Sequence, residues 1–169
     1  MSEMLIFHSF DAVDGGQFFD VYRGSSDENC VSFYPELEKA EALREYEKGY
    51  LDFMRNSFFN EGGTLLILSE GGRYVSALRL IEEAEGKYYL EALETDPDYR
   101  KRGCAKELLF RLQKYLKEQS GRYTLTSHVE KTNTASLNTH FTVGFEITAD
   151  YIIEDGERYD SDYELTYKC

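Results

Sequence analysis

Two different spacings of apolar residues follow one another along the chain, and the change falls near Thr64. Before it, apolar side chains between Glu36 and Phe59 recur every three or four residues. This spacing predicts a helix that starts near Pro35 and is interrupted near Gly49. After the change, the apolar positions fit strands: Thr64–Ser69 and Tyr74–Ile81 flank a glycine-rich turn, as in a β-hairpin.

The other elements alternate between strands and helices. Ser25–Asn29 has the composition of a loop. Strands are predicted over Leu5–Phe10, Tyr88–Thr95, Arg122–Val129, Phe145–Ile153 and Arg158–Lys168, the last two as a hairpin, and helical segments over Gln17–Arg23, Cys104–Gln119 and Asn133–Val143. This order, with one central crossover, predicts an α+β fold.

The segment Asp96–Ala105 joins the predicted strand Tyr88–Thr95 to the predicted helix Cys104–Gln119 and carries three basic residues and a glycine. A strand that turns directly into a helix presents backbone N–H groups and a helix N-terminus to an anion, most often a phosphate. The turn lacks the GK[ST] of a P-loop and the GxGxxG of a dinucleotide-binding fold. It is therefore an anion-binding turn of another kind.

Composition narrows the function classes. A net charge of −13 argues against nucleic-acid binding as the main activity. An acidic protein with one basic turn suits an anionic cofactor and a cationic second substrate. The alternative is that the acidity only keeps the protein soluble. Three scattered cysteines argue against a disulfide framework or a zinc site. No apolar run approaches the about 18 residues of a membrane span and no signal peptide is indicated, so we expect a cytoplasmic protein.

Two blocks in this sequence resemble those of the GCN5-related N-acetyltransferase (GNAT) superfamily. Arg100–Ala105 reads R-x-x-G-x-A, and thirty residues after Gly103 the block Asn133–Phe145 reads N-x-x-[AS]-x-x-x-[YH]-x-x-x-G-F. The resemblance is strongest over residues 64–153. It implies a mixed, largely antiparallel central sheet flanked by helices, in a single domain over residues 1–169. It also implies acetyl-CoA as co-substrate, with no metal. The acetyl group would be transferred directly to a primary amine, which we expect to belong to a small molecule.

The resemblance assigns cofactor contacts to the basic turn and to the end of the preceding strand. The implied cofactor-binding residues are Leu93, Glu94, Thr95, Arg100, Lys101, Arg102, Gly103, Cys104, Ala105, Lys106 and Asn133. An ordinary basic helix start is the alternative for the turn, plain sheet pairing is the alternative for the strand end, and helix capping is the alternative for Asn133.

Two catalytic residues are implied. His140 stands where the family usually has a tyrosine, and there it resembles the general acid that reprotonates the leaving thiolate; the alternative is a structural histidine beside Phe145. Glu91 is the implied base. Strict strand alternation places Glu91 on the same face as Leu93, with Glu94 opposite as a weaker competitor.

The acceptor is the least determined part of the prediction. We expect a primary amine, cationic in solution, that enters an acidic pocket including Glu91; the region Pro35–Phe59 and the terminal hairpin would select it. There are three alternatives. The protein could acetylate a protein or peptide amine, it could be a non-catalytic acyl-CoA-binding or sensor module with the same fold, or it could be an unrelated phosphate-binding α+β protein. A homodimer is left open, and neither nucleic acid nor membrane is expected as a partner.

Overall fold

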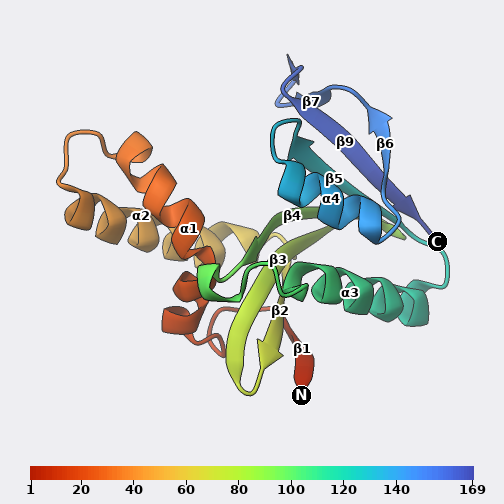
Figure 1. Ribbon diagram of the computed structural model, residues 1–169, viewed down its shortest axis with the longest axis horizontal. Coiled ribbons are helices and arrows are strands. Elements are labelled where there is room, and N and C mark those ends of the chain that lie inside the picture. The colour runs from red at the N-terminus through yellow and green to blue at the C-terminus, as the bar shows by residue number, and fades with distance from the viewer.

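The computed structural model describes residues 1–169 and consists of one large sheet with helices on both faces, joined to a small hairpin (Figure 1). The strands are β1 (Ser2–Phe7), β2 (Thr64–Glu70), β3 (Arg73–Ala84), β4 (Lys87–Thr95), β5 (Thr124–Glu130), β6 (Glu146–Ala149), β7 (Ile152–Glu154), β8 (Glu157–Tyr159) and β9 (Asp162–Lys168). The helices are α1 (Gly15–Phe33), α2 (Lys39–Phe53), α3 (Cys104–Ser120) and α4 (Thr134–Thr142), with a π-helical turn at Met54–Phe58 and a 3₁₀ turn at Pro97–Tyr99. None of these helices is at once long and apolar enough to span a lipid bilayer.

The large sheet has seven strands in the order β1-β2-β3-β4-β5-β9-β6. Every neighbouring pair is antiparallel except β4 and β5, which are parallel and are connected by the crossover helix α3. The predicted α+β fold with a mixed, largely antiparallel sheet is therefore confirmed.

The alternation of side chains along β2 divides the interior into two cores. Leu65 and Ile67 pack on one face with α1 and the π-helical turn, around the fully buried ring of Phe18. Leu66 and Leu68 pack on the other face with α3 and α4. A strand that is apolar on both faces must be covered on both, and this requirement places the helices in two layers.

Helix α1 corrects the prediction for the N-terminal region. It covers both the short helical turn predicted at Gln17–Arg23 and the loop predicted at Ser25–Asn29. Asp14 caps its first turn with a side-chain hydrogen bond, and Ser26 and Cys30 are buried within it. Packing against the sheet thus overrides the loop-like composition, as tertiary burial commonly overrides weak helix propensity.

Helix α2 begins at Lys39 rather than at Pro35 and runs through Gly49 without a break. One glycine in an exposed helix costs only about 1 kcal/mol, which is not enough to interrupt it. The irregularity lies further on, where the helix widens into the π-helical turn at Met54–Phe58. Strand β1 is also displaced from its predicted position at Leu5–Phe10, since it spans Ser2–Phe7.

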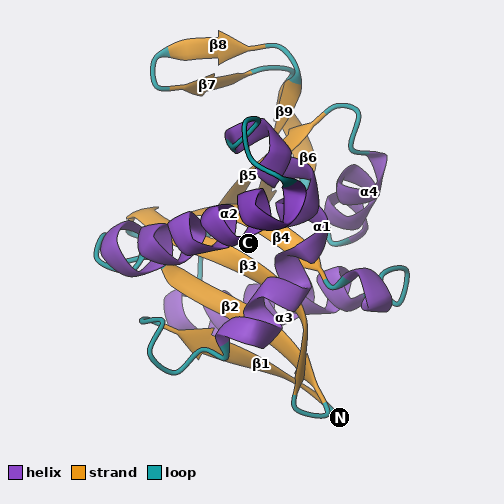
Figure 2. Ribbon diagram, turned by 90° about the vertical axis from the view of Figure 1, so that its left-hand side faces the viewer, coloured by secondary structure: helices purple, strands orange, loops and turns teal.

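The terminal hairpin is more complex than predicted. Strands β6 and β9 do pair with each other, but β9 also pairs with β5 and so lies inside the sheet. Strands β7 and β8 form a separate hairpin that projects beyond the sheet (Figure 2). It turns at Asp155 and Gly156, which both have positive φ, as two-residue hairpin turns require.

Candidate active site

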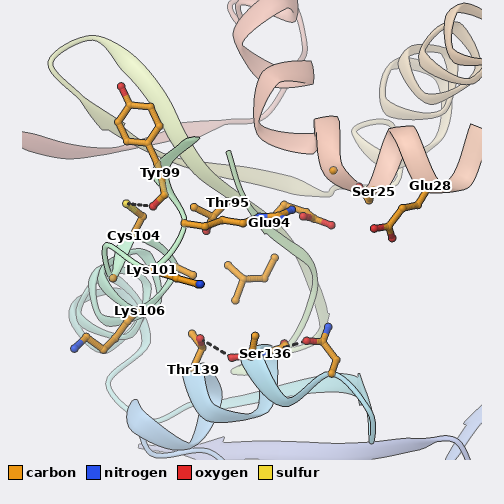
Figure 3. A pocket seen from close by; sticks show the side chains of 17 residues that line it. Ser25, Glu28, Glu94, Thr95, Tyr99, Lys101, Cys104, Lys106, Ser136 and Thr139 are labelled. Carbon is orange, nitrogen blue, oxygen red and sulfur yellow. Dashed lines mark hydrogen bonds between the residues drawn. The ribbon is translucent and has the colours of Figure 1, made fainter. Parts of the chain in front are cut away.

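A cleft opens where β4 and β5 separate. The two strands pair only over Lys87–Leu90 and Thr124–Ser127, and beyond these residues their backbones diverge. The space between them contains a cavity of about 610 Å³. Its walls come from α1, the end of β4, the turn into α3 and the helix α4, which surround it in Figure 3.

The predicted cofactor residues gather around this cavity with one exception. Those on its wall are Leu93, Glu94, Thr95, Arg100, Lys101, Gly103, Cys104, Ala105, Lys106 and Asn133. Arg102 is absent from the wall because its guanidinium stacks on Tyr99 at 4.7 Å and forms an ion pair with Glu70 at 3.2 Å. The turn therefore directs only part of its positive charge toward the cavity.

The turn into α3 has the backbone geometry of an anion-binding site. Lys101 and Gly103 both have positive φ, of 61° and 82°, and Gly103 caps the helix without any side-chain hydrogen bond. The first N–H groups of a helix have no partner within the helix, and the helix dipole adds positive charge there. Burial raises the pKa of the Cys104 thiol, which disfavours the thiolate that a nucleophile would need.

Helix α1 supplies part of the wall that sequence reasoning missed. Gly24, Ser25 and Glu28 line the cavity, although this stretch was predicted to be largely loop. A Cβ on Gly24 would collide with the guanidinium of Arg100, so the glycine lets Arg100 lie across the helix. A glycine followed by small polar residues within an amphipathic stretch was the only signal for this contact.

A bulge in β4 changes which side chains face the helices. Ala92 has a φ of +50°, and the register with β3 shifts there, so that two residues of β4 oppose one residue of β3. Ala92 consequently packs on the α1 side of the sheet, while Leu93 packs against the α3 core. Glu91 faces the α1 side, as its ion pair with Arg79 shows, and the prediction that Glu91 shares a face with Leu93 is wrong.

Glu94 lies on the wall of the large cavity and also on the wall of a second one. Burial raises the pKa of the Glu94 carboxyl, while a hydrogen bond with Ser25 and the charge of Arg100 act in the opposite direction. Glu91 lies on the wall of neither cavity, because its carboxylate is held 3.0 Å from Nε of Arg79.

The second cavity has a volume of about 200 Å³ and lies between α1, α2 and the strands β3 and β4. It shares Ser25 and Glu94 with the large cavity, so these two residues lie between the two cavities. Three tyrosines form much of its wall: Tyr22, Tyr46 and Tyr50. No sequence motif marks this cavity, because its residues come from α1, α2, β3 and β4.

Helix α4 forms the last wall. Asn133 accepts a hydrogen bond from the backbone N–H of Ser136 at 3.0 Å and also lines the cavity, so the capping alternative holds together with a position at the site. His140 is 1% exposed, stacks edge-on against Phe145 and is absent from the cavity wall. Its Nδ1 lies 2.8 Å from the backbone oxygen of Ser136, and burial lowers its pKa.

Asp96 anchors the turn from the protein interior, and sequence reasoning had not singled it out. Its side chain is fully buried and accepts a hydrogen bond from the backbone N–H of Asp98 at 2.9 Å. It also forms ion pairs with Arg23 of α1 at 3.5 Å and Arg73 of β3 at 3.3 Å. These contacts tie the turn to helix α1 and to strand β3. The aspartate before a proline was the available signal, since aspartate is a strong helix-capping residue.

Comparisons with known proteins agree with this geometry. The model of the acetyltransferase (GNAT) family matches residues 28–145. The PaiA N-acetyltransferase of Thermoplasma acidophilum, solved in complex with coenzyme A, is 21% identical over 99% of both chains, with a TM-score of 0.65. An IAA acetyltransferase of Bacillus cereus is 13% identical over 100% of both chains, with a TM-score of 0.63.

A third structure extends the comparison. A GNAT family acetyltransferase of Elizabethkingia anophelis with acetyl-CoA bound is 15% identical over 68% of this chain and 80% of its own, with a TM-score of 0.55. At these identities the solved structures show a shared fold. No curated protein sequence is significantly similar to the chain.

Proposed function

Since this chain belongs to the acetyltransferase (GNAT) family, and is thus an acyltransferase, we propose that it transfers the acetyl group of acetyl-CoA directly to a primary amine of a small molecule. The observation that carries this proposal is a pair of adjacent cavities that share Ser25 and Glu94. One is lined by the N-terminus of α3 and cationic side chains, and the other has three tyrosines on its wall. Glu94 and Ser25 stand at their junction, where an acyl donor and an amine would meet.

The residues of the large cavity fit an acyl-CoA. The N-terminal amides of α3, together with Lys101 and Lys106, offer hydrogen-bond donors and positive charge to a pyrophosphate. The end of β4 is free of β5 over Leu93–Thr95, so its backbone groups are open to an extended, amide-containing arm. When bound, acetyl-CoA supplies a thioester as the activated acyl group.

Glu94 is the base in this proposal. A primary amine is protonated at neutral pH and must lose a proton before it can attack a thioester. A carboxyl whose pKa is raised by burial is a better proton acceptor than an exposed one. Glu91, the base that the resemblance implied, is paired with Arg79 and lies on the wall of neither cavity.

We assign the proton donor for the departing thiolate to helix α4, which forms one wall of the large cavity. A thiol with a pKa of about 8.5 demands little proton donation, so a hydroxyl or a water suffices. Ser136 lies on the wall, and its hydroxyl is 3.4 Å from Nδ1 of His140. His140, the implied acid, thus acts behind Ser136 as a positioning residue.

A small-molecule acceptor is favoured over a protein amine by the size of the second cavity. Its volume of about 200 Å³ suits a small molecule.

The proposal is tested by incubating the protein with acetyl-CoA and a panel of primary amines while free thiol is followed. We expect thiol release that depends on the amine and an acetylated amine as product. Tight CoA binding with no thiol release for any amine would identify a non-catalytic acyl-CoA-binding module. Equal affinity for CoA and for unrelated nucleotides would contradict both the acetyltransferase and the acyl-CoA-binding module.

A further inference from the structure

Arg79 occupies an unusual position in the second cavity. It lies on β3 directly opposite Glu91 of β4, and its side chain is 13% exposed. Its guanidinium stands over three rings at once, at 5.5 Å from Tyr50, 4.9 Å from Phe53 and 5.6 Å from Phe58. A charged group in such a box is held rigidly, because the rings and the carboxylate leave it little freedom.

The guanidinium of Arg79 has no hydrogen-bond partner within the protein, and one of its three nitrogens is buried. Nε is buried without a hydrogen-bond partner, since its N–H does not point at the Glu91 oxygen that lies 3.0 Å away. The other N–H groups of Arg79 make no hydrogen bond within the protein either, and the side chain lines the second cavity. A buried N–H without an acceptor is costly, whereas the terminal N–H groups are not buried and are free to bind a ligand in the cavity.

We infer that Arg79 binds a carboxylate carried by the acceptor amine, at the end of the acceptor remote from the amine. This inference rests on the proposed function, since it names the substrate class of that same site. A guanidinium presents parallel N–H groups that match the two oxygens of a carboxylate, and charge-assisted pairs of this kind are strong. The acceptor is therefore a small amino acid or a related amino carboxylate.

The charged groups on the wall of the second cavity match such a molecule. The ammonium group is attracted to Glu94, which both cavities share, and the carboxylate to Arg79. Three tyrosines on the same wall suit an apolar linker. A diamine fits less well, because its second ammonium would meet the fixed positive charge of Arg79.

A role of Arg79 as a counter-ion for Glu91 alone does not account for its unused donors. The ion pair occupies one nitrogen, and it does so without a hydrogen bond. A purely structural arginine would be expected to use its terminal N–H groups on protein carbonyls, as Arg111 does on Ser2.

The experiment compares acceptors that differ only at the far end. For chains of three to six carbons, we would measure kcat/KM for the ω-amino carboxylate, its carboxamide, the plain alkylamine and the diamine; α-amino acids and their decarboxylated amines form a second series. At the best-fitting length, or in the α series, the carboxylate is expected to be preferred over the plain amine by about 10- to 100-fold. Equal or better use of the plain amine or the diamine in both series would overturn the inference while leaving the proposed function intact.

Variants assign the preference to Arg79. Arg79→Lys keeps the charge but loses the fork, and the double variant Arg79→Met with Glu91→Gln avoids leaving a buried carboxylate unpaired. Both are expected to lose the carboxylate preference, because kcat/KM falls much more for the carboxylate than for the plain alkylamine. Arg55→Met is the matched control, because Arg55 also stacks on a ring, that of Phe10, but lies outside both cavities. A preference that survives in the double variant would overturn the inference.

A binding measurement decides the matter if no amine is acetylated. Calorimetry on the CoA-loaded protein would compare an N-acetylated amino carboxylate with the corresponding N-acetylated alkylamine. Tighter binding of the carboxylate that is lost in the double variant supports the inference, even if turnover, and with it the proposed function, fails. Equal binding of the two probes would overturn it.

Discussion

The two cavities that meet at Ser25 and Glu94 are built from different materials. The large cavity uses backbone amides, positive φ angles and a helix N-terminus, and most of its wall comes from the continuous segment Leu93–Lys106. The small cavity uses side chains from α1, α2, β3 and β4, and its wall includes three tyrosines. A site made of backbone groups depends on the conformation of the chain and tolerates many substitutions. A site made of side chains can change its ligand when a single side chain is replaced.

The junction residue Glu94 should show the largest effect, because both cavities depend on it. Glu94→Gln keeps the shape and removes the base, so kcat/KM is expected to fall by about 10²- to 10⁴-fold. Glu91→Gln is the matched comparison and is expected to lose much less. If Glu91→Gln lost more than Glu94→Gln, the base would be Glu91 and the assignment made from the two cavities would fail.

The pH dependence sharpens this test. Burial raises the pKa of Glu94 above the ordinary glutamate value of 4.5. The acidic limb of the plot of kcat/KM against pH is therefore expected to have its midpoint above pH 4.5, and this limb should be absent in Glu94→Gln. The folded state then holds a proton that the unfolded state has lost, so stability falls as pH rises from 4.5 through the raised pKa. Glu94→Gln is therefore expected to be more stable than the native protein at neutral pH, as urea unfolding would measure.

The backbone character of the large cavity is tested at Gly103. Gly103→Val places a branched residue at a φ of +82°, which strains the turn that presents the amides, and CoA affinity is expected to fall by at least about tenfold. Gly121→Val is a matched control at the other end of α3: its φ is also positive, at 69°, and its Cβ would also meet open space. Both variants should lose similar stability, and only the first should lose CoA affinity by calorimetry. Equal CoA affinity in the two variants would contradict the assignment of the turn at Gly103 as the pyrophosphate-binding site.

His140 tests whether α4 contributes chemistry or packing to the large cavity. Burial lowers its pKa, so the unfolded state binds the extra proton first, and stability is lost as pH falls from 6.5 through the lowered pKa. His140→Phe is expected to remove this loss between pH 7.5 and 5, with kcat changed by less than about threefold. A fall in kcat approaching 10²-fold, at an unchanged KM for acetyl-CoA, would restore His140 as the general acid.

The smallest effect is expected at Arg102, whose side chain is turned away from the large cavity. Arg102→Gln removes a half-exposed ion pair with Glu70, which contributes about 0–1 kcal/mol to stability, and should leave CoA affinity nearly unchanged. Lys101→Gln, on the cavity wall, is expected to weaken CoA binding and to reduce its dependence on salt. If the two variants weakened CoA binding equally, the turn would act through its overall charge rather than through its geometry.

Local features of the sequence determined the fold class and most of the large cavity. The strand, turn and helix around Gly103 could be read from adjacent residues, because φ preferences, capping and helix dipoles act within a few positions. Asn133 was readable for the same reason, since a helix cap contacts residues only two or three positions away.

Only the tertiary structure decided the small cavity and the candidate base. The bulge at Ala92 shifts the register of β4 and breaks the strict alternation from which the faces of Glu91 and Glu94 were predicted. Burial turned the loop-like Ser25–Asn29 into a helix wall and withdrew His140 from the cleft. Burial and long-range pairing sum contacts from the whole chain, so no short stretch of sequence contains the information that fixed Arg79 beside the acceptor.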